Sequence, residues 1–183
     1  GIYAVKVLDD EGHGYESTVA SGIDHCVAQG AHIINLSLAL DAEGRSSVIE
    51  DAIFDAYSRG ALIVAGAGNS GGAVSFPANS IYVLGVSAST RSDRLAGFSG
   101  RGPEIEFVAP GEDIYSADNN GGYAVLSGTS MSAPHVSGLA ALVVNSPDGR
   151  LRTRDEIWTL LINSATRLSR LDINEQGDRK SVV

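Results

Sequence analysis

The sequence predicts an α/β protein, a three-layer α/β/α fold built around a mostly parallel sheet. Short and almost wholly apolar runs alternate along the chain with segments in which apolar residues recur at helical spacing, and glycines or other turn residues separate them. This alternation is typical of βαβ units, whose helices cover both faces of a parallel sheet. Ligands of such folds gather at the carboxyl ends of the strands, so a functional site is expected there.

The first half of the chain supplies strands and helices in turn. Its strands are β-branched or apolar runs bounded by turn residues, and its helices end at Gly30 and Gly60, which act as stop signals. The expected strands are 2–8, 33–38 and 61–65, and the expected helices are 17–29 and 46–58. The run 33–38 is nearly continuous in apolar residues, as expected for a strand covered on both faces.

The second half adds strands to the sheet and then a hairpin. Strands are expected at 82–86 and 106–108. Two further strands, 113–117 and 123–126, are separated by a turn sequence rich in asparagine and glycine, which predicts an antiparallel hairpin. A helix of small and apolar residues is expected after Gly128, and a last helix over 153–164.

Length, charge and composition exclude several classes of protein. A chain of 183 residues has the size of one domain, and its 22 glycines fit a globular protein with many tight turns. A net charge of −9 argues against nucleic acid as a partner, because a phosphate-binding surface needs clustered Lys and Arg. No apolar run approaches the roughly 20 residues that span a bilayer, so no membrane partner is expected. The single cysteine, Cys26, lies within an expected helix and is interpreted as a small buried hydrophobe.

The stretch 128–143 predicts a helix that begins beside a serine hydroxyl. Thr129 or Ser130 is expected to be its N-cap, and Pro134 falls early enough that its missing N–H should remove little helix bonding. The positive end of the helix dipole would favour negative charge near the Ser130 hydroxyl, where an acyl-transfer reaction develops an oxyanion. The residues alone leave two interpretations open: a presented nucleophile, or a packed helix with a capping serine.

The sequence GTSMSAPHVSG at 128–138 resembles the segment around the catalytic serine of subtilisin-like serine proteases, the subtilase or peptidase S8 family. Other segments resemble the family in the same order: YAVKVL at 3–8, INLSL at 34–38, AGN at 67–69, FSGRGP at 98–103 and VAPG at 108–111. The resemblance runs from the first residue to about residue 168, and 169–183 form a divergent tail. It implies that 1–183 is a partial domain, about the carboxyl-terminal two-thirds of a serine endopeptidase catalytic domain.

The resemblance assigns the chemistry to two side chains. Ser130 matches the nucleophile, and Asn69 matches the asparagine whose side-chain N–H binds the oxyanion. Asn69 follows the buried strand 61–65 within a glycine-rich loop. Taken from the residues alone, it could equally be an asparagine that tolerates a left-handed turn. The nearby GNSGG at 68–72 is similar to the nucleophile motif of chymotrypsin-like proteases, but those are all-β and disulfide-bonded, so Ser70 is rejected as a nucleophile.

The resemblance also implies a peptide or protein substrate held in extended form by strand addition. The segments that match the walls of the family's substrate cleft contribute mostly main-chain atoms. They comprise Asn35, Leu36, Ser37, Leu38, Ala39, Gly66, Ala67, Gly68 and Thr129. Family members often have glycine where this chain has Ala39 and Leu40, so the shape of its pocket is expected to differ.

The resemblance implies no cofactor for the chemistry, but it does imply a possible structural calcium ion. Glu104 and Glu106 flank one strand residue and so share a face. In the family, acidic residues at this place, with carbonyls from the turn near Ala78, can hold a cation, and such oxygen ligands suit calcium. The alternative is two solvated surface glutamates. The Phe76-Pro77 bond matches a family position that is often cis.

The family's aspartate and histidine motifs precede the segment that resembles 3–8 and are absent from this chain. None of its four histidines lies in an H-G-T-H sequence, and His135 matches a packing residue. We therefore expect the isolated chain to be inactive. In the family, the strand that carries the aspartate lies between those resembling 2–8 and 33–38, so we expect a closed-up sheet, a swapped protomer or a separate amino-terminal catalytic segment. A non-catalytic peptide-binding or scaffolding relative is the alternative function, and a secreted location is favoured by the resemblance.

Overall fold

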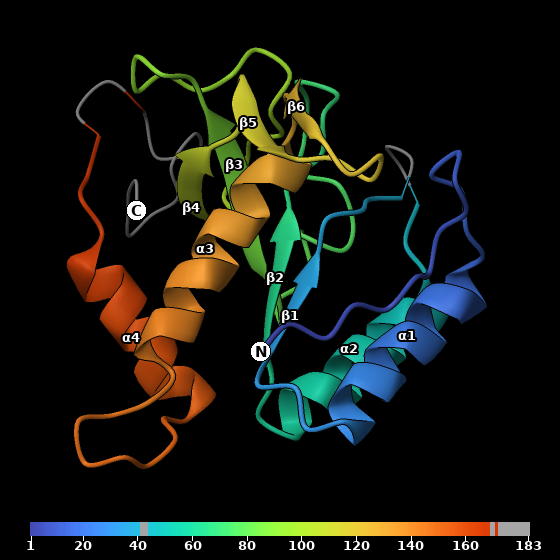
Figure 1. The fold of residues 1–183 in the computed structure, drawn as a ribbon, viewed down its shortest axis with the longest axis vertical. Helices are drawn as coiled ribbons and strands as arrows, with labels where there is room; N and C mark the ends of the chain where they lie inside the picture. The colour runs from blue at the N-terminus through green and yellow to red at the C-terminus, as the bar shows by residue number, and fades with distance from the viewer. Residues whose placement is uncertain (41–43, 169–170, 172–183) are drawn as a thin grey trace.

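The structure, a computed structural model, describes residues 1–40, 44–168 and 171. Figure 1 shows the arrangement of the helices and strands in these residues. The helices are α1 (Glu16–Ala28), α2 (Ser47–Ser58), α3 (Thr129–Val143) and α4 (Arg154–Ser164). The strands are β1 (Ile33–Leu36), β2 (Leu62–Gly66), β3 (Leu84–Ser89), β4 (Ile105–Pro110), β5 (Ile114–Ala117) and β6 (Tyr123–Leu126).

The central sheet has the order β1-β2-β3-β4, and all its neighbouring strands are parallel. Helices α1 and α2 pack together on one face, and α3 and α4 cover the other (Figure 1). Every residue of β2 and β3 is buried, because helices cover both sides of these strands. The predicted three-layer α/β/α fold with a parallel sheet is therefore confirmed.

The predicted hairpin is also present and stands apart from the central sheet. Strands β5 and β6 pair in antiparallel fashion, with Ile114 opposite Leu126 and Ala117 opposite Tyr123. The rings of Tyr115 and Tyr123 stack on it at 5.2 Å between centroids. The hairpin leads into α3 and lies beside that helix's first turn (Figure 1). It therefore forms a wall next to the serine.

The prediction of a strand at 2–8 is wrong. Within the described residues this segment forms no ladder, and β1 pairs only with β2. Val5 and Val7 instead pack on α1, where one methyl group of each valine lies over Gly22. The alternating apolar residues of 2–8 thus mark the side of this segment that packs on α1, and they do not indicate hydrogen bonding to a neighbouring strand. The alternative of a sheet closed up by pairing of 2–8 with β1 is not realised.

The ends of the helices follow local signals. The Ser46 side chain accepts a hydrogen bond from the N–H of Ile49 and caps α2. Thr153 and Glu156 form a capping box at the start of α4. The predicted cap of α3 is wrong, because Gly128 occupies the N-cap position and neither Thr129 nor Ser130 caps the helix.

Several smaller features belong to the framework rather than to a site. Cys26 is half-buried against the core on the α1 side, and burial raises the pKa of its thiol. The Phe76-Pro77 peptide bond is cis. Across the described part of the chain, none of the helices is both long and apolar enough to cross a membrane.

Candidate active site

Ser130 is the second residue of α3, at the carboxyl edge of the sheet. The inner face of α3, formed by Ala133, Val136 and Ala140, is fully buried against the strands. Gly66 at the end of β2 lets the chain approach closely, since a Cβ there would lie 2.8 Å from the Thr129 Oγ1 and 2.9 Å from its carbonyl oxygen. The start of α3 is therefore held directly against the end of a central strand.

Asn69 is joined to the same turn through its side-chain oxygen. The Asn69 Oδ1 accepts hydrogen bonds from the Thr129 backbone N–H at 2.9 Å and from its Oγ1 at 3.1 Å. The Thr129 Oγ1 in turn accepts from the Gly68 N–H at 3.1 Å. Asn69 thus satisfies a backbone donor at the start of α3. The Thr129 hydroxyl bonds Asn69 and Gly68 rather than an N–H of its own helix, so Thr129 does not act as the cap.

This arrangement fixes the direction of the Asn69 amide. Because Oδ1 is bound twice to Thr129, the amide nitrogen Nδ2 is the end that remains for another group, and no described residue accepts a hydrogen bond from it. The Nδ2 atom lies 3.4 Å from the position of a Cβ on Gly128. The left-handed conformations in this loop belong to Gly68 and Gly71, with φ of +96° and +71°, and not to Asn69. The alternative that Asn69 is a turn residue tolerating a left-handed conformation is therefore wrong.

The hydroxyl of Ser130 faces the end of β1. Its Oγ donates to the Ser37 carbonyl at 3.3 Å, and the Ser37 Oγ donates back to the Ser130 carbonyl at 2.9 Å. The Ser37 hydroxyl also accepts from the Asn35 Nδ2 at 2.8 Å, and the Asn35 Oδ1 accepts from the Ser137 Oγ at 2.9 Å. Segments about a hundred residues apart in the sequence therefore meet at Ser130.

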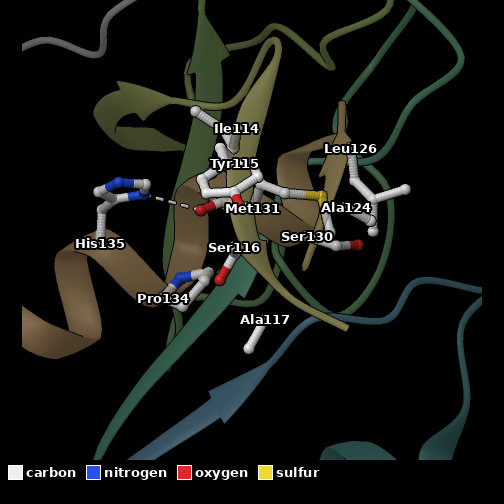
Figure 2. A pocket seen from close by; sticks show the side chains of 10 residues that line it. All are labelled: Ile114, Tyr115, Ser116, Ala117, Ala124, Leu126, Ser130, Met131, Pro134 and His135. Carbon is white, nitrogen blue, oxygen red and sulfur yellow. Dashed lines mark hydrogen bonds between the residues drawn. The ribbon is translucent and has the colours of Figure 1, made fainter. Parts of the chain in front are cut away.

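A cavity of about 390 Å³ opens beside Ser130, between the β5–β6 hairpin and α3. Figure 2 shows its lining side chains, which are mostly apolar. They are Ile114, Tyr115, Ser116, Ala117, Ala124, Leu126, Ser130, Met131, Pro134 and His135. The Nδ1 of His135 lies 2.8 Å from the Met131 carbonyl oxygen, and His135 and Ser130 lie at opposite ends of the cavity (Figure 2).

No general base for Ser130 is found among residues 1–40, 44–168 and 171. No histidine, aspartate or glutamate there forms a hydrogen bond with the Ser130 Oγ, whose partner is the Ser37 carbonyl. A carbonyl oxygen cannot take the proton of a serine in an acyl transfer. The described residues therefore present a hydroxyl and an amide donor but not the group that would activate the hydroxyl.

The predicted substrate-binding residues differ in how they lie relative to Ser130, and one of them, Gly66, is the glycine at the end of β2 that packs against Thr129. Asn35, Ser37, Gly68 and Thr129 take part in the hydrogen bonds described above. The side chains of Leu36, Leu38 and Ala67 pack into or against the core, while Ala39 is exposed. Their role in binding substrate stays a prediction, and for the buried members it could involve only main-chain atoms.

Sequence reasoning missed Ser137 and the hairpin wall of the cavity. Ser137 lies two helical turns after Ser130 and so shares its face of α3, a spacing that could have indicated it. The apolar side chains of Ile114 and Leu126 were assigned to a hairpin but not to a cavity. Nothing in the local pattern shows which face of the hairpin turns toward the helix that follows it.

The predicted calcium site is incomplete in the described residues. The carbonyl oxygens of Ala78 and Glu104 both lie 2.9 Å from the position of a Cβ on Gly85, so two main-chain oxygens converge over β3. However, among these residues no group of three or more acidic, histidine or cysteine side chains could hold a metal ion. Glu104 is exposed and Glu106 is half-buried in β4. Calcium therefore stays a prediction, and no step of the chemistry depends on it.

The fold and the site together define an α/β protein that presents a serine hydroxyl at a helix start, beside an asparagine amide, at the carboxyl edge of a parallel sheet. Comparison with known proteins gives the family. The model of the Subtilase family, Peptidase_S8, matches residues 1–179, and the chain belongs to this family.

Individual relatives agree with the family assignment. The chain is 43% identical over 177 residues to Subtilisin Savinase of Lederbergia lenta, covering 96% of this chain and 64% of that protein. It is 41% identical over 157 residues to the Thermophilic serine proteinase of Bacillus sp. (strain AK1), covering 85% of this chain and 39% of that protein. The solved structure named Sphericase matches with a TM-score of 0.81 and 32% identity over 97% of this chain and 66% of that chain. The chain thus spans less than two thirds of the length of these curated relatives.

Proposed function

We propose that this chain is the carboxyl-terminal part of the catalytic domain of a serine endopeptidase. The Ser130 Oγ attacks the carbonyl carbon of a peptide bond and forms a tetrahedral adduct whose oxygen carries the negative charge. The C–N bond then breaks, the hydroxyl proton passes through a base to the departing amine, and an ester of Ser130 remains. Water hydrolyses the acyl-enzyme and restores Ser130. Membership of the subtilase family supports this activity.

The observation that carries the proposal is the orientation of Asn69. Its Oδ1 is held by Thr129, so its Nδ2 is left to donate to the oxyanion that forms when Ser130 attacks a carbonyl. Such a donor acts in the transition state because the negative charge develops there. A serine with only a capping or packing role needs no such neighbour.

The base and the aspartate that orients it are proposed to come from outside this chain. A preceding catalytic segment is the first candidate, and a swapped protomer is the second. The apolar cavity beside Ser130, together with the edge of β1 that pairs with no strand among the described residues, provides surface on which such a segment could pack. By itself, the chain is proposed to turn over no substrate.

Substrate and location follow from the relatives. An extended peptide or protein chain is proposed to pair with the main chain of 35–39 and 66–68. The relatives are named as proteases, and one, from Bacillus subtilis (strain 168), is named "Minor extracellular protease Epr". We therefore propose an extracellular location for the whole protein.

Labelling with a fluorophosphonate tests the proposal, because this reagent reacts only with an activated serine. The purified chain alone should remain unlabelled, and addition of the protein's preceding polypeptide should produce labelling at Ser130. Ser130→Ala should abolish it, whereas Ser70→Ala, a matched exposed serine in the nearby loop, should not. A non-catalytic peptide-binding relative would bind an extended peptide and stay unlabelled in every combination. Labelling of the chain alone would show that a base exists within these residues.

A further inference from the structure

Pro134 removes a helical hydrogen bond from the residue that carries the candidate nucleophile. In an α-helix each N–H donates to the carbonyl four residues earlier, and proline has no N–H. Pro134 is the sixth residue of α3, so the carbonyl that loses this donor is that of Ser130. A proline in the first turn of a helix would have removed no such bond. The sequence places the gap in the helical ladder at the serine itself.

Ser37 supplies a donor to that same carbonyl from across the site. Its Oγ donates to the Ser130 carbonyl oxygen at 2.9 Å, a normal hydrogen-bond length. Its own carbonyl accepts from the Ser130 Oγ at 3.3 Å. One residue at the end of β1 therefore contacts both the main chain and the side chain of Ser130.

We propose that Ser37 is a positioning residue for Ser130, and that its hydroxyl replaces the backbone donor that Pro134 removes. The structural part of this inference stands on the hydrogen bonds alone. Its consequence for the reaction rests on the function proposed above. When Ser130 turns its hydroxyl toward a base, its bond to the Ser37 carbonyl is lost, but the bond between the Ser37 Oγ and the Ser130 carbonyl persists and keeps the residue in place.

Two further side chains set the direction of the Ser37 hydroxyl. The Asn35 Nδ2 donates to the Ser37 Oγ at 2.8 Å, which leaves the hydroxyl proton for the Ser130 carbonyl. The Ser137 Oγ lies 2.9 Å from the Asn35 Oδ1 and 3.2 Å from the Ala133 carbonyl, and its shorter bond, to Asn35, favours the amide with its nitrogen toward Ser37. Each donor in this chain of bonds points toward Ser130, an arrangement in which neighbouring bonds strengthen one another.

A double-mutant cycle on the purified chain tests the structural part. Ser37→Ala should raise the equilibrium constant of unfolding by about 3- to 10-fold, because it leaves the Ser130 carbonyl without this donor. In a Pro134→Ala background the new N–H of residue 134 can bond that carbonyl, so Ser37→Ala should change the constant by less than about 2-fold. Ser37→Thr keeps the hydroxyl and should behave like the original chain. Ser21→Ala, which removes an exposed hydroxyl on α1, should have the same small effect in both backgrounds.

The same variants in the assembled enzyme test the positioning role. Ser37→Ala should lower kcat by about 3- to 10-fold with little change in KM, and adding Pro134→Ala should restore part of the loss. Equal effects of Ser37→Ala with and without Pro134 would overturn the inference, as would an unchanged kcat. If Ser37→Ala alone does not fold, the double variant Ser37→Ala/Pro134→Ala should fold, because the new N–H of residue 134 bonds the Ser130 carbonyl, and Ser37→Thr should fold because it keeps the hydroxyl. Failure of both variants to fold would also overturn the inference. Absence of any labelling of the original enzyme would instead refute the proposed function and leave the unfolding cycle intact.

Discussion

The two sides of Ser130 differ in burial: the turn that carries the serine is buried against the sheet, whereas the cavity beside it is lined by exposed side chains. On the sheet side, Gly128 and Thr129 are buried, and the backbone N–H of Thr129 is bonded to Asn69. On the hairpin side, Tyr115 is 68% exposed and Leu126 is 51% exposed, although both line the cavity. The chain therefore completes one wall of its candidate site and leaves large apolar side chains uncovered on the other.

The two faces of α3 show the same difference. Its inner face packs into the core through Ala133, Val136 and Ala140, whereas Leu142 on its outer face is 80% exposed. The groups proposed to position Ser130 and to bind the oxyanion lie on the closed side, and the base proposed to activate the serine is expected on the open side.

The largest effect on the closed side is expected for Asn69. In the assembled enzyme, Asn69→Ala should lower kcat by about 10²-fold and leave KM nearly unchanged, a magnitude taken from the matching donor of a subtilisin. The reason is that the amide nitrogen donates to negative charge that exists only in the transition state. Steady-state kinetics on a peptide substrate measure both constants.

Asn69→Asp is the matched control for this change. The aspartate keeps an oxygen that accepts from Thr129 but has no N–H to donate, so it separates support of α3 from stabilisation of the oxyanion. The free energy of unfolding should fall for Asn69→Ala by about 1 kcal/mol, as for loss of a helix cap, and less for Asn69→Asp. An Asn69→Asp enzyme with the original kcat would show that the amide donor plays no part in the reaction.

A pair of glycine substitutions probes the contrast between the closed and open sides with a smaller effect. Gly66→Ala places a Cβ within 2.9 Å of Thr129 and should lower the free energy of unfolding by about 1–3 kcal/mol. Gly138→Ala meets nothing within 4 Å on the outer face of α3, and should raise it by about 0.5–1 kcal/mol because alanine favours a helix. Denaturant unfolding of both variants measures the difference. Equal destabilisation by the two would mean that the outer face of α3 is as closely packed as the inner face.

The sequence was sufficient to predict those features that local patterns encode. Apolar runs at 61–65 and 106–108 indicated strands, and the eleven residues at 128–138 located Ser130 through their resemblance to a family. Asn69 was found by the same route. The strand predictions are confirmed because a single segment carries the whole signal, while the roles of Ser130 and Asn69 stay predictions.

Features that depend on two distant segments could not be predicted in this way. The strand expected at 2–8 failed because its alternating pattern reflects packing on α1, which the pattern alone cannot distinguish from packing within a sheet. The cap of α3 failed because the Thr129 hydroxyl bonds two residues about sixty positions earlier: it donates to the Asn69 Oδ1 and accepts from the Gly68 N–H. The bond from Ser37 to the Ser130 carbonyl joins residues 93 positions apart, and only the fold brings them together.

The smallest expected effect lies away from both sides of the candidate site, at the exposed start of α4. The pKa of Glu156 is lowered from 4.5 to about 2, chiefly by its hydrogen bond to Arg150 and then by that from the Thr153 backbone. The ionised carboxylate thus binds these groups in the folded chain but not in the unfolded chain. Its stabilising contribution is present above pH 4.5 and is lost as the pH falls through the folded-state pKa of about 2.

Glu156→Gln isolates that charge, because glutamine can still accept from Thr153 in a capping box while losing the ion pair with Arg150. The difference in unfolding midpoint between the original chain and Glu156→Gln should therefore shrink as the pH is lowered from about 5 toward about 2. It should also shrink in about 1 M salt, because the pair is exposed and screened. Glu11→Gln is the control, since within the described residues the Glu11 side chain has no hydrogen bond or ion pair. A Glu156→Gln difference that stays constant across this pH range would show that the ion pair with Arg150 contributes nothing and that the capping box alone holds the start of α4.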